Sequence, residues 1–381
     1  MTVFTSLFRL VPGWLLLLGL TVEAAPLVPQ APRIEARAWL LVDAQSGQSL
    51  AEQQPDQRVE PASLTKLMTA YLTFQALKEG RLKADQTPPV SDQAWRAEGS
   101  RMFLDPRKPA PVSELIKGLI VQSGNDASIV LAEAVAGSEA GFVDLMNQQA
   151  RRLGLTGTRF QNATGLPHPE HYSSARDLAR LALALIRDFP EYYTLYSMKE
   201  YSHGGITQPN RNRLLWIDPN VDGVKTGHTQ SAGFCLIASA KREQRRLLSV
   251  VVGAQSDNAR AVESQKLLNY GFQFFETVKL YGANQPVAKL RLYKGTSSEA
   301  AVGFARDFYV TVPRGAAKQL RGQVVSQQPL LAPVSQGQAI ATLRLTLDGQ
   351  PRGDYPLVAL QAVGVSGLIR RAWDSLMLML Q

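Results

Sequence analysis

The stretch EPASLTKLMT at residues 60–69 places a serine, Ser63, three residues before a lysine, Lys66. Pro61 at its start and apolar residues at three- and four-residue steps predict an amphipathic helix that ends near Gly80. Because residues three apart on a helix share a face, the Lys66 amine can reach the Ser63 hydroxyl. A serine becomes a good nucleophile only when a neighbouring base takes its proton. Burial near other cations would lower the pKa of Lys66 far enough for it to be that base.

Two further short strings follow along the chain, SGN at residues 123–125 and KTGH at residues 225–228. Each string alone is a weak signal, because Ser63 could be a helix cap, Asn125 a turn residue and Lys225 a solvated strand charge. Their order and wide spacing, about sixty residues and then about one hundred, are those of the penicillin-recognising serine enzymes. Together the three strings predict a serine acyl-transfer site.

The SGN string offers a hydroxyl and an amide on a predicted turn. Ser123 can pass a proton between Lys66 and the leaving amine of a substrate. The Asn125 side chain can hold both Lys66 and a substrate amide. We therefore expect Ser63, Lys66 and Ser123 to be the catalytic residues and Asn125 to bind substrate.

The KTGH string lies on a predicted strand whose edge can pair with an extended peptide. Gly227 lets another backbone approach this strand closely. Lys225 and Thr226 offer a cation and a hydroxyl to a substrate carboxylate. The expected oxyanion donors are the backbone N–H groups of Ser63, at the positive end of a helix dipole, and of His228.

Residues 25–282 are expected to form one catalytic domain that carries all three strings. Strand patterns at its two ends enclose a helical middle, which predicts an α/β fold with a mixed sheet flanked by helices. The predicted strands are residues 38–43, 48–52, 223–229, 232–241 and 246–253. The predicted helices after the first are residues 112–122, 126–136, 140–153, 175–187 and 257–275, and residues 99–111 are expected to be a surface loop.

The character of the chain changes beyond residue 282 to short alternating runs separated by turn signals, which predicts a small all-β domain over residues 283–365. Residues 366–381 are amphipathic, with Trp373 on the apolar face and Arg370 and Arg371 beside it. A helix of this length suits a bilayer interface and is too short to span the core. The alternative is a helix packed on its own domain.

Residues 1–24 combine a basic residue, Arg9, with an apolar stretch and small residues before the expected cleavage point after Ala24. This pattern is typical of a secretory signal peptide. The alternative is an uncleaved anchor, for which the apolar run is short. Export would permit disulfides, yet the single cysteine, Cys235, cannot form one internally and is expected to be a buried thiol.

The formal net charge of +9 suits an anionic membrane surface or cell-wall polymer. Nucleic acid is not an expected partner, because no stripe of basic residues alternates with aromatic ones. The four histidines lack the spacing of metal ligands, so we expect neither a metal nor another cofactor.

On these strings the chain resembles the low-molecular-mass penicillin-binding proteins that are serine-type D-alanyl-D-alanine carboxypeptidases, of the DacA/DacC (PBP5-like) kind. The resemblance covers essentially the whole mature chain. It is carried by residues 60–69, by QSGNDA at 122–127 and by VDGVKTGHT at 221–229, and also by GSRMFL at 99–104 and GFQFFETV at 271–278.

The resemblance implies a transpeptidase/β-lactamase-type domain, a β-rich second domain and a C-terminal anchor on the periplasmic face of the inner membrane. It implies that Ser63 attacks the bond between the two terminal D-alanines of the peptidoglycan pentapeptide, releases D-alanine and passes the acyl group to water. β-Lactams would acylate the same serine. Arg260 resembles the family's arginine near the substrate carboxylate, whereas Gln230-Ser231 departs from the family's usual acidic-basic pair, which bears on fine substrate preference.

Three other functions stay open at this point. A class A β-lactamase would need a glutamate in a separate loop to activate the deacylating water, and the sequence offers no clear equivalent. A DD-endopeptidase would cut cross-links between stem peptides with the same chemistry. A scaffold would organise partners through the β domain, although intact catalytic strings argue against it.

Overall fold

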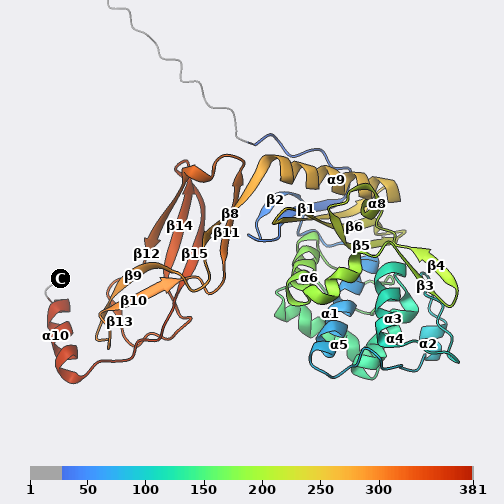
Figure 1. Ribbon diagram of the computed structural model, residues 1–381, viewed down its shortest axis with the longest axis horizontal. Coiled ribbons are helices and arrows are strands. Elements are labelled where there is room, and N and C mark those ends of the chain that lie inside the picture. The colour runs from blue at the N-terminus through green and yellow to red at the C-terminus, as the bar shows by residue number, and fades with distance from the viewer. Residues whose placement is uncertain (1–27, 380–381) are drawn as a thin grey trace, which may run out of the picture.

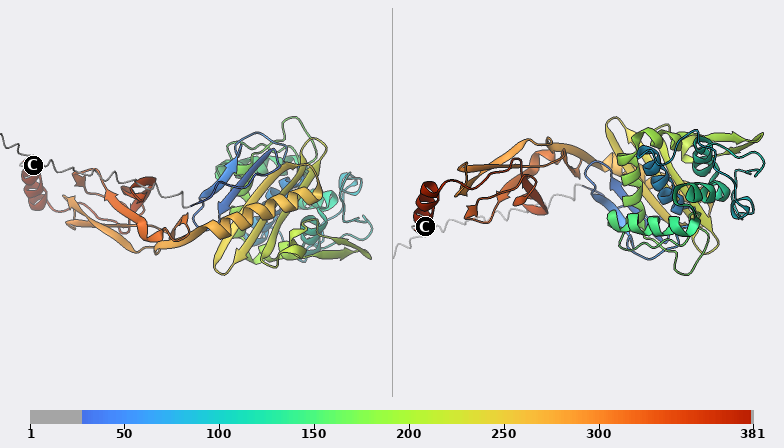
Figure 2. Two further views of the ribbon diagram at one scale, coloured as in Figure 1. Left: turned by 90° about the horizontal axis from the view of Figure 1, so that it is seen from above. Right: turned by 90° about the horizontal axis from the view of Figure 1, so that it is seen from below.

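The computed structural model of the protein describes residues 28–379, so the predicted signal peptide, residues 1–24, lies outside the described residues. An α/β unit and an all-β unit follow one another along an elongated molecule, and helix α10 (Leu368–Met379) lies at the far end of the β unit (Figures 1 and 2). This arrangement confirms the predicted fold class.

A five-stranded sheet, in the order β2-β1-β7-β6-β5, is the frame of the α/β unit. All its strand pairs are antiparallel, so the prediction that this sheet is mixed is wrong. Along β1, Leu40 packs into one hydrophobic core and Leu41 into the other, because successive side chains on a strand point to opposite faces. Both faces of the sheet are therefore covered. The strands are β1 (Ala38–Asp43), β2 (Ser49–Gln53), β5 (Val221–Thr229), β6 (Gly233–Arg242) and β7 (Arg245–Ala254).

Helices cover the two faces unequally. The long helix α9 (Asp257–Phe274) crosses one face, as Figure 2 shows, and contributes Leu267 and Leu268 to the smaller core. The larger core lies under α1 (Lys66–Lys78), α3 (Val112–Lys117), α4 (Asn125–Ala136), α5 (Glu139–Arg152) and α6 (Ala175–Asp188). The remaining elements of the unit are α2 (Asp92–Trp95), α7 (Pro190–Tyr193), α8 (Leu214–Ile217) and the hairpin β3 (Glu200–His203) and β4 (Ile206–Pro209).

The helix predicted over residues 112–122 is present, but its second half is π-helical and not α-helical. After α3 the chain forms a π-helical turn, Gly118–Gln122, and then reaches Ser123 in the left-handed conformation with φ of 58°. A Cβ at Gly118 would lie 2.3 Å from Met102 Sδ, so the predicted surface loop packs against this turn. Met102 and Leu104 in that loop are buried, and their N–H groups donate to the Asp126 carboxylate at 3.0 and 3.1 Å. This irregular turn brings Ser123 to the position described below.

The second unit is all-β, as predicted. Its six-stranded sheet has the order β12-β14-β15-β10-β9-β13, and a second pair, β8 (Phe275–Tyr281) and β11 (Phe308–Pro313), packs against it. Although the sequence grouped residues 275–282 with the α/β domain, β8 hydrogen-bonds along β11. The sheet strands are β9 (Pro286–Tyr293), β10 (Glu299–Gly303), β12 (Leu320–Val325), β13 (Leu330–Leu331), β14 (Ala339–Leu347) and β15 (Gln350–Ala359).

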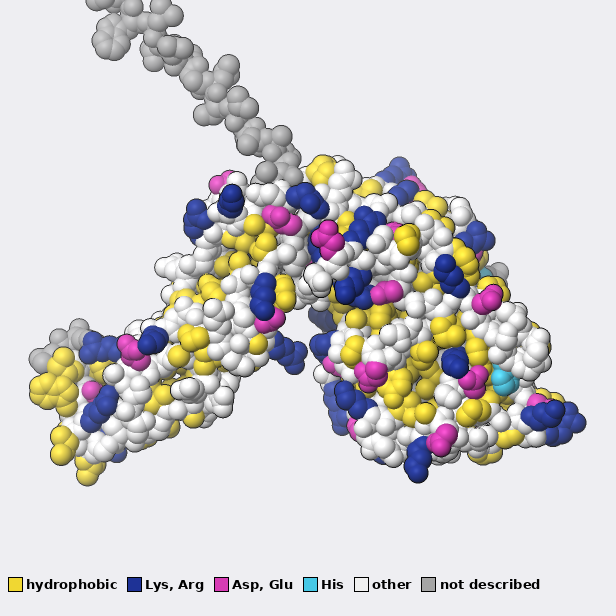
Figure 3. All heavy atoms as spheres, viewed as in Figure 1, with side chains coloured by type: hydrophobic (Ala, Val, Ile, Leu, Met, Phe, Trp, Pro, Cys, Tyr) yellow, Lys and Arg dark blue, Asp and Glu magenta, His cyan; other side chains and the backbone are white. Residues whose placement is uncertain are grey.

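The apolar side chains of helix α10 are exposed to solvent. Exposure ranges from 50% to 90% for five of them, and Figure 3 shows hydrophobic side chains gathered at this end of the molecule. The five are Leu368, Ile369, Trp373, Leu376 and Met379. The alternative in which this face packs on its own domain is therefore wrong. Within residues 28–379, no helix has both the length and the apolar character that crossing a bilayer requires.

Candidate active site

The first string forms a 3-10 turn, Ala62–Thr65, that leads directly into α1. Ser63 lies in this turn, and Ala62 before it has a positive φ of 47°, a backbone conformation that costs energy for a residue with a Cβ. Lys66 is the first residue of α1 and is 1% exposed. Its Nζ lies 3.1 Å from Ser63 Oγ, as the three-residue spacing predicts.

The Lys66 amine has two further partners. Its Nζ donates to Asn125 Oδ1 at 2.7 Å and to the backbone oxygen of Thr164 at 2.6 Å. Burial and then the nearby charge of Arg211 lower the pKa of Lys66 to about 7. A neutral amine has two N–H donors and one lone pair, so these two bonds leave the lone pair for the Ser63 hydroxyl. Lys66 is thus placed and tuned to accept the Ser63 proton.

Thr164 was not among the residues singled out from the sequence. It lies on a tight turn in which the Asn162 side chain accepts a bond from Gly165 N at 2.7 Å. Gly165 has a φ of 86°, and a Cβ there would lie 1.8 Å from the Ala62 backbone oxygen. Only glycine fits this position, so the turn seats the Thr164 carbonyl against Lys66. The string NATG marks a turn, but a backbone carbonyl leaves no side-chain signal in a sequence.

Asn125 begins α4 and is 4% exposed. Besides accepting from Lys66, its side chain donates from Nδ2 to the backbone oxygen of Glu98 at 2.6 Å, and its own N–H donates to Ser100 O at 2.6 Å. These bonds fix the amide so that its oxygen faces Lys66. The predicted contact between Asn125 and Lys66 is present.

The third string lies on β5, the edge strand of the sheet. Lys225 Nζ donates to Ser123 Oγ and to Thr226 O, both at 3.0 Å. The sequence had paired Ser123 with Lys66, whereas the cation bonded to its hydroxyl is Lys225. Burial, followed by the charges of Lys66, Arg211 and Arg260, lowers the pKa of Lys225 well below its usual value.

Packing within the protein also requires a glycine at position 227. A Cβ there would lie 3.1 Å from Pro61 O and 3.3 Å from Ala62 Cβ. The sequence analysis predicted that a substrate backbone would approach Gly227 closely. In the structure, the turn that carries Ser63 makes this close approach. Gly227 therefore lets β5 lie directly against the nucleophile's own segment.

Arg260, on α9, is 4% exposed and donates to Gly227 O at 3.1 Å and to Arg211 O at 3.4 Å, and it pairs with Asp257. It therefore supports both β5 and the backbone of Arg211. Arg211, which the sequence reasoning missed, is exposed at the cavity wall. Cys235 is buried as predicted, and burial raises the pKa of its thiol to about 11.

Part of this arrangement lines one open cavity of about 420 Å³, whereas Lys66, Asn125 and Lys225 are not among its lining residues. Its polar lining places four hydroxyl groups and two guanidinium groups around a strand edge. The lining residues are Ser63, Gly99, Ser100, Ser123, Arg211, Thr226, Gly227, His228, Phe234, Asp257 and Arg260. Within residues 28–379, no group of three or more His, Cys, Asp or Glu side chains is arranged to hold a metal ion.

Comparison with known proteins adds two family matches. Residues 25–256 match the model for D-alanyl-D-alanine carboxypeptidases, and residues 275–365 match the model for the C-terminal domain of penicillin-binding protein 5. The chain is 44% identical to the D-alanyl-D-alanine carboxypeptidase DacC of Escherichia coli (strain K12), over 99% of this chain and 97% of that protein.

Solved structures agree with the sequence matches. Penicillin-binding protein 5 from Haemophilus influenzae superposes with a TM-score of 0.85 at 40% identity, covering 88% of this chain and 99% of that one. Penicillin-binding protein D2 from Listeria monocytogenes in its ampicillin-bound form has a TM-score of 0.60 at 30% identity, covering 64% of this chain and all of that one. The chain therefore belongs to the D-alanyl-D-alanine carboxypeptidase family and is a serine-type peptidase of that class.

Proposed function

We propose that Ser63 is the nucleophile with which this carboxypeptidase removes the terminal D-alanine from peptidoglycan pentapeptide stems. The observation that carries the proposal is the buried Lys66 amine, 3.1 Å from Ser63 Oγ and with a pKa lowered to about 7. At neutral pH about half of such amines are neutral and able to accept the hydroxyl proton.

The reaction proceeds in two steps. Ser63 Oγ attacks the carbonyl carbon of the penultimate D-alanine while its proton moves to Lys66 Nζ, and the C–N bond then breaks as the leaving amine takes a proton. That proton comes through Ser123, which Lys225 contacts at 3.0 Å and whose pKa-lowered ammonium is a ready donor. The proton on Lys66 then passes to Lys225 through Ser123, which leaves Lys66 neutral again. Water attacks the ester carbonyl and gives a proton to Lys66, and Lys66 returns it to Ser63 Oγ as the C–O bond breaks and the shortened peptide leaves.

The substrate lies along the free edge of β5. Thr226, Lys225 and the exposed Arg211 hold the carboxylate of the terminal D-alanine, while Arg260 supports Arg211 from behind. The N–H groups of Ser63 and His228 bind the developing oxyanion. Gly227 keeps these two N–H groups close together, because it lets β5 approach the turn that carries Ser63.

β-Lactam antibiotics acylate the same serine and act as inhibitors. The Listeria relative with ampicillin bound shares 30% of its sequence with this chain and supports this proposal. In class A β-lactamases a glutamate activates the water that frees the serine. The titratable group bonded to Ser63 here is Lys66 and not a glutamate.

The proposal extends to where the protein works. Residues 1–24 are the signal peptide, residues 25–282 the catalytic domain, residues 283–365 the β-rich domain and residues 366–381 a peripheral anchor on the periplasmic face of the inner membrane. The exposed apolar face of α10 supports the anchor. Because α10 lies at the far end of the β unit, the catalytic domain stands away from the membrane, toward the peptidoglycan (Figure 1).

The direct test incubates the mature protein and its Ser63→Ala variant with a peptide that ends in D-Ala-D-Ala and quantifies free D-alanine. We expect release by the first protein and a loss of at least a thousandfold in the second. Release that survives Ser63→Ala would refute the assignment of the nucleophile. Release by neither protein, with cross-linked muropeptides cleaved instead, would favour an endopeptidase.

A further inference from the structure

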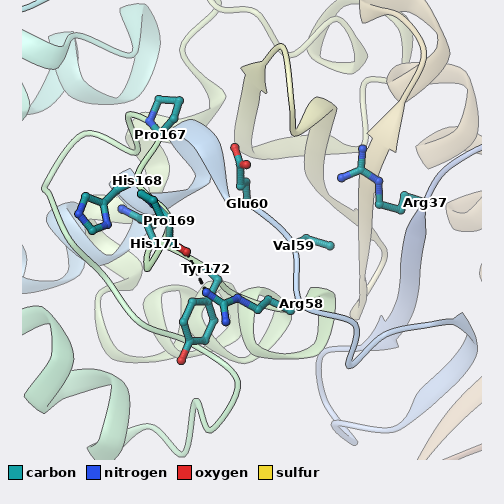
Figure 4. A pocket seen from close by; sticks show the side chains of 9 residues that line it. All are labelled: Arg37, Arg58, Val59, Glu60, Pro167, His168, Pro169, His171 and Tyr172. Carbon is teal, nitrogen blue, oxygen red and sulfur yellow. Dashed lines mark hydrogen bonds between the residues drawn. The ribbon is translucent and has the colours of Figure 1, made fainter.

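The catalytic unit has further cavities beside its active site. One lies between residues 58–60 and residues 167–172, as Figure 4 shows. Glu60 on its wall accepts from Thr229 and Ser231 at the end of β5, so this cavity continues the strand edge on which the substrate lies. Another cavity, of about 610 Å³, lies beside the start of α4, and none of the reaction steps uses it.

This other cavity is formed mainly by the loop between α2 and α3, and we call it the loop cavity. Its volume lies in the range of sites that bind a small molecule. Six of the side chains that line it are aromatic or charged: Trp95, Arg101, Phe103, Asp105, Arg107 and Asp126.

Trp95 is exposed on a fixed support. It is the last residue of the short helix α2 and is 47% exposed, whereas Ala94 before it is fully buried. Ser91, which caps α2, donates to Glu133 on α4 at 2.8 Å and so holds α2 against the domain. The indole therefore offers an apolar surface whose position is set before any ligand arrives.

Phe103 is exposed at the expense of backbone strain. Its ring is 48% exposed, although Met102 and Leu104 on either side are buried. The N–H groups of these two neighbours both donate to the Asp126 carboxylate, and Phe103 between them has a positive φ of 64°. This left-handed conformation is unfavourable for an aromatic residue, and such strain is concentrated at functional sites.

The charged side chains of the loop cavity balance one another. Arg107 pairs with Asp105 through two hydrogen bonds of 3.1 Å, and the Arg101 guanidinium lies 5.2 Å from the centre of the Phe103 ring. Two guanidinium groups and two carboxylates, the second being Asp126, leave no net charge, which favours an uncharged ligand over a phosphate or a lipid headgroup. Guanidinium N–H groups can donate to hydroxyl and amide oxygens of such a ligand.

The loop cavity lies near the end of the molecule that is opposite to α10. Figure 1 shows α2 and the β3–β4 hairpin at one end and α10 at the other, and Figure 2 shows the same separation. With α10 on the membrane, the end that carries Trp95 is turned toward the cell-wall polymer. The polymer is therefore the uncharged ligand that this end can meet.

The same loop also holds a residue of the active site. Ser100, between Trp95 and Phe103 in the chain, lines the active-site cavity, and its carbonyl accepts from the Asn125 N–H at 2.6 Å. The carbonyl of Glu98 accepts from Asn125 Nδ2 at 2.6 Å. The loop cavity and the active site are thus two sides of one loop, and a polymer can contact both.

We propose that the loop cavity binds an N-acetylated sugar ring of the glycan strands that carry the stem peptides. Such a ring has an apolar C–H face, which suits the rings of Trp95 and Phe103, and a rim of hydroxyl and amide oxygens, which suits Arg101 and Arg107. This inference rests on the proposed function, because it concerns the polymer that bears the same substrate. It makes the enzyme favour stems on glycan strands over free peptides.

The first test measures binding without turnover. Of the five tryptophans, Trp14 lies in the predicted signal peptide, so the mature protein has four indole N–H signals in NMR after nitrogen labelling. The β-1,4-linked tetramer of N-acetylglucosamine, which contains no peptide, is added to about 10 mM, enough to saturate a site with a Kd of about 1 mM. We expect the Trp95 signal, assigned with Trp95→Phe, to shift, and the signal of Trp216, which is 48% exposed on α8, to stay.

The second test compares kcat/KM for D-alanine release from pentapeptide stems on glycan strands and from the free pentapeptide. A ring contact of about 1 kcal/mol corresponds to about fivefold, so Trp95→Ala and Phe103→Ala should each lower the ratio of the two values about fivefold. Trp216→Ala removes an equally exposed indole and is the matched control, which should keep the ratio. Because both substrates meet the same protein, a general loss of folding cancels in the ratio.

A Trp95 signal that does not move, or a ratio that survives in both variants, would overturn the sugar site. A dimer in sedimentation velocity that Trp95→Ala dissociates would also overturn it, since a second copy of the chain would then cover the ring. Failure of the wild type to release D-alanine from either substrate would instead refute the proposed function, while the NMR titration would still decide the sugar site.

Discussion

Replacing Asn125 by aspartate tests whether Lys66 works as a neutral base. The Asn125 oxygen lies 2.7 Å from Lys66 Nζ, so Asn125→Asp puts a negative charge against the amine with almost no change in shape. Two opposite charges about 4 Å apart attract by about 4 kcal/mol at an effective dielectric constant of about 20. Since 1.36 kcal/mol corresponds to one pKa unit, the pKa of Lys66 should rise by about 3 units, from about 7 to about 10.

The pH dependence of kcat/KM measures both the direction and the size of this change in the pKa of Lys66. The neutral fraction of Lys66 at pH 7 falls from about one half to about one in a thousand, so kcat/KM for D-alanine release should fall about 500-fold at that pH. The acid limb of the pH profile should move from about 7 to about 10, and activity should recover as the pH is raised. Asn125→Ala is the control, because it removes the same bonds without adding charge and should lower the rate while leaving the limb near 7. A limb that stays near 7 in Asn125→Asp would refute the role of Lys66.

Three further changes probe other parts of the account. Gly165→Ala forces a Cβ to 1.8 Å from the Ala62 oxygen, so the free energy of unfolding should fall by about 3 kcal/mol or more. Gly205→Ala, in the open β3–β4 turn, is the control and should lower it by only about 1 kcal/mol. Equal losses of the two variants in denaturant melts would contradict the packing of the Thr164 turn against Ala62. Arg211→Met should lower kcat/KM for peptides with a free terminal carboxylate about tenfold, and the same effect on a peptide carboxamide would rule out carboxylate binding. Deleting residues 366–381 should move the protein from sedimented anionic vesicles to the supernatant with D-alanine release unchanged, and persistent sedimentation would refute the anchor.

How far the sequence predicts the site depends on how local each contact is. The Ser63–Lys66 contact follows from helical spacing alone, and the structure has it at 3.1 Å. The contact between Ser123 and Lys225 joins residues about one hundred positions apart, and no periodicity encodes it. The prediction that the three strings form one site depended on their resemblance to a family. That resemblance did not predict which lysine bonds to Ser123.

Other features left no readable signal. The Thr164 carbonyl acts through the backbone, and Arg211 lies in an irregular segment where an arginine is ordinarily a solvated charge. The π-helical turn before Ser123 interrupts a pattern that reads as a continuous helix, because Met102 from a distant loop occupies the space beside Gly118. The fold class was predictable because strand patterns at the two ends of the first unit enclose a helical middle. The amphipathic pattern predicted for the first helix is wrong, since α1 is buried on nearly all sides.

The tail shows the opposite case, where the sequence left two readings and the structure separates them. An amphipathic helix can pack on its own domain or present its apolar face elsewhere. Since Ile369 is 90% exposed and Trp373 is 63% exposed, the first reading does not hold for this face.

The central claim is that Ser63 forms an ester with the substrate and with β-lactams, and mass spectrometry tests it most directly. The intact mature protein is incubated with a penicillin at pH 7, and a proteolytic digest then locates the added mass. The account predicts one equivalent of added mass, confined to the peptide that contains Ser63 and absent from Ser63→Ala. Added mass on another residue, or undiminished labelling of Ser63→Ala, would contradict it.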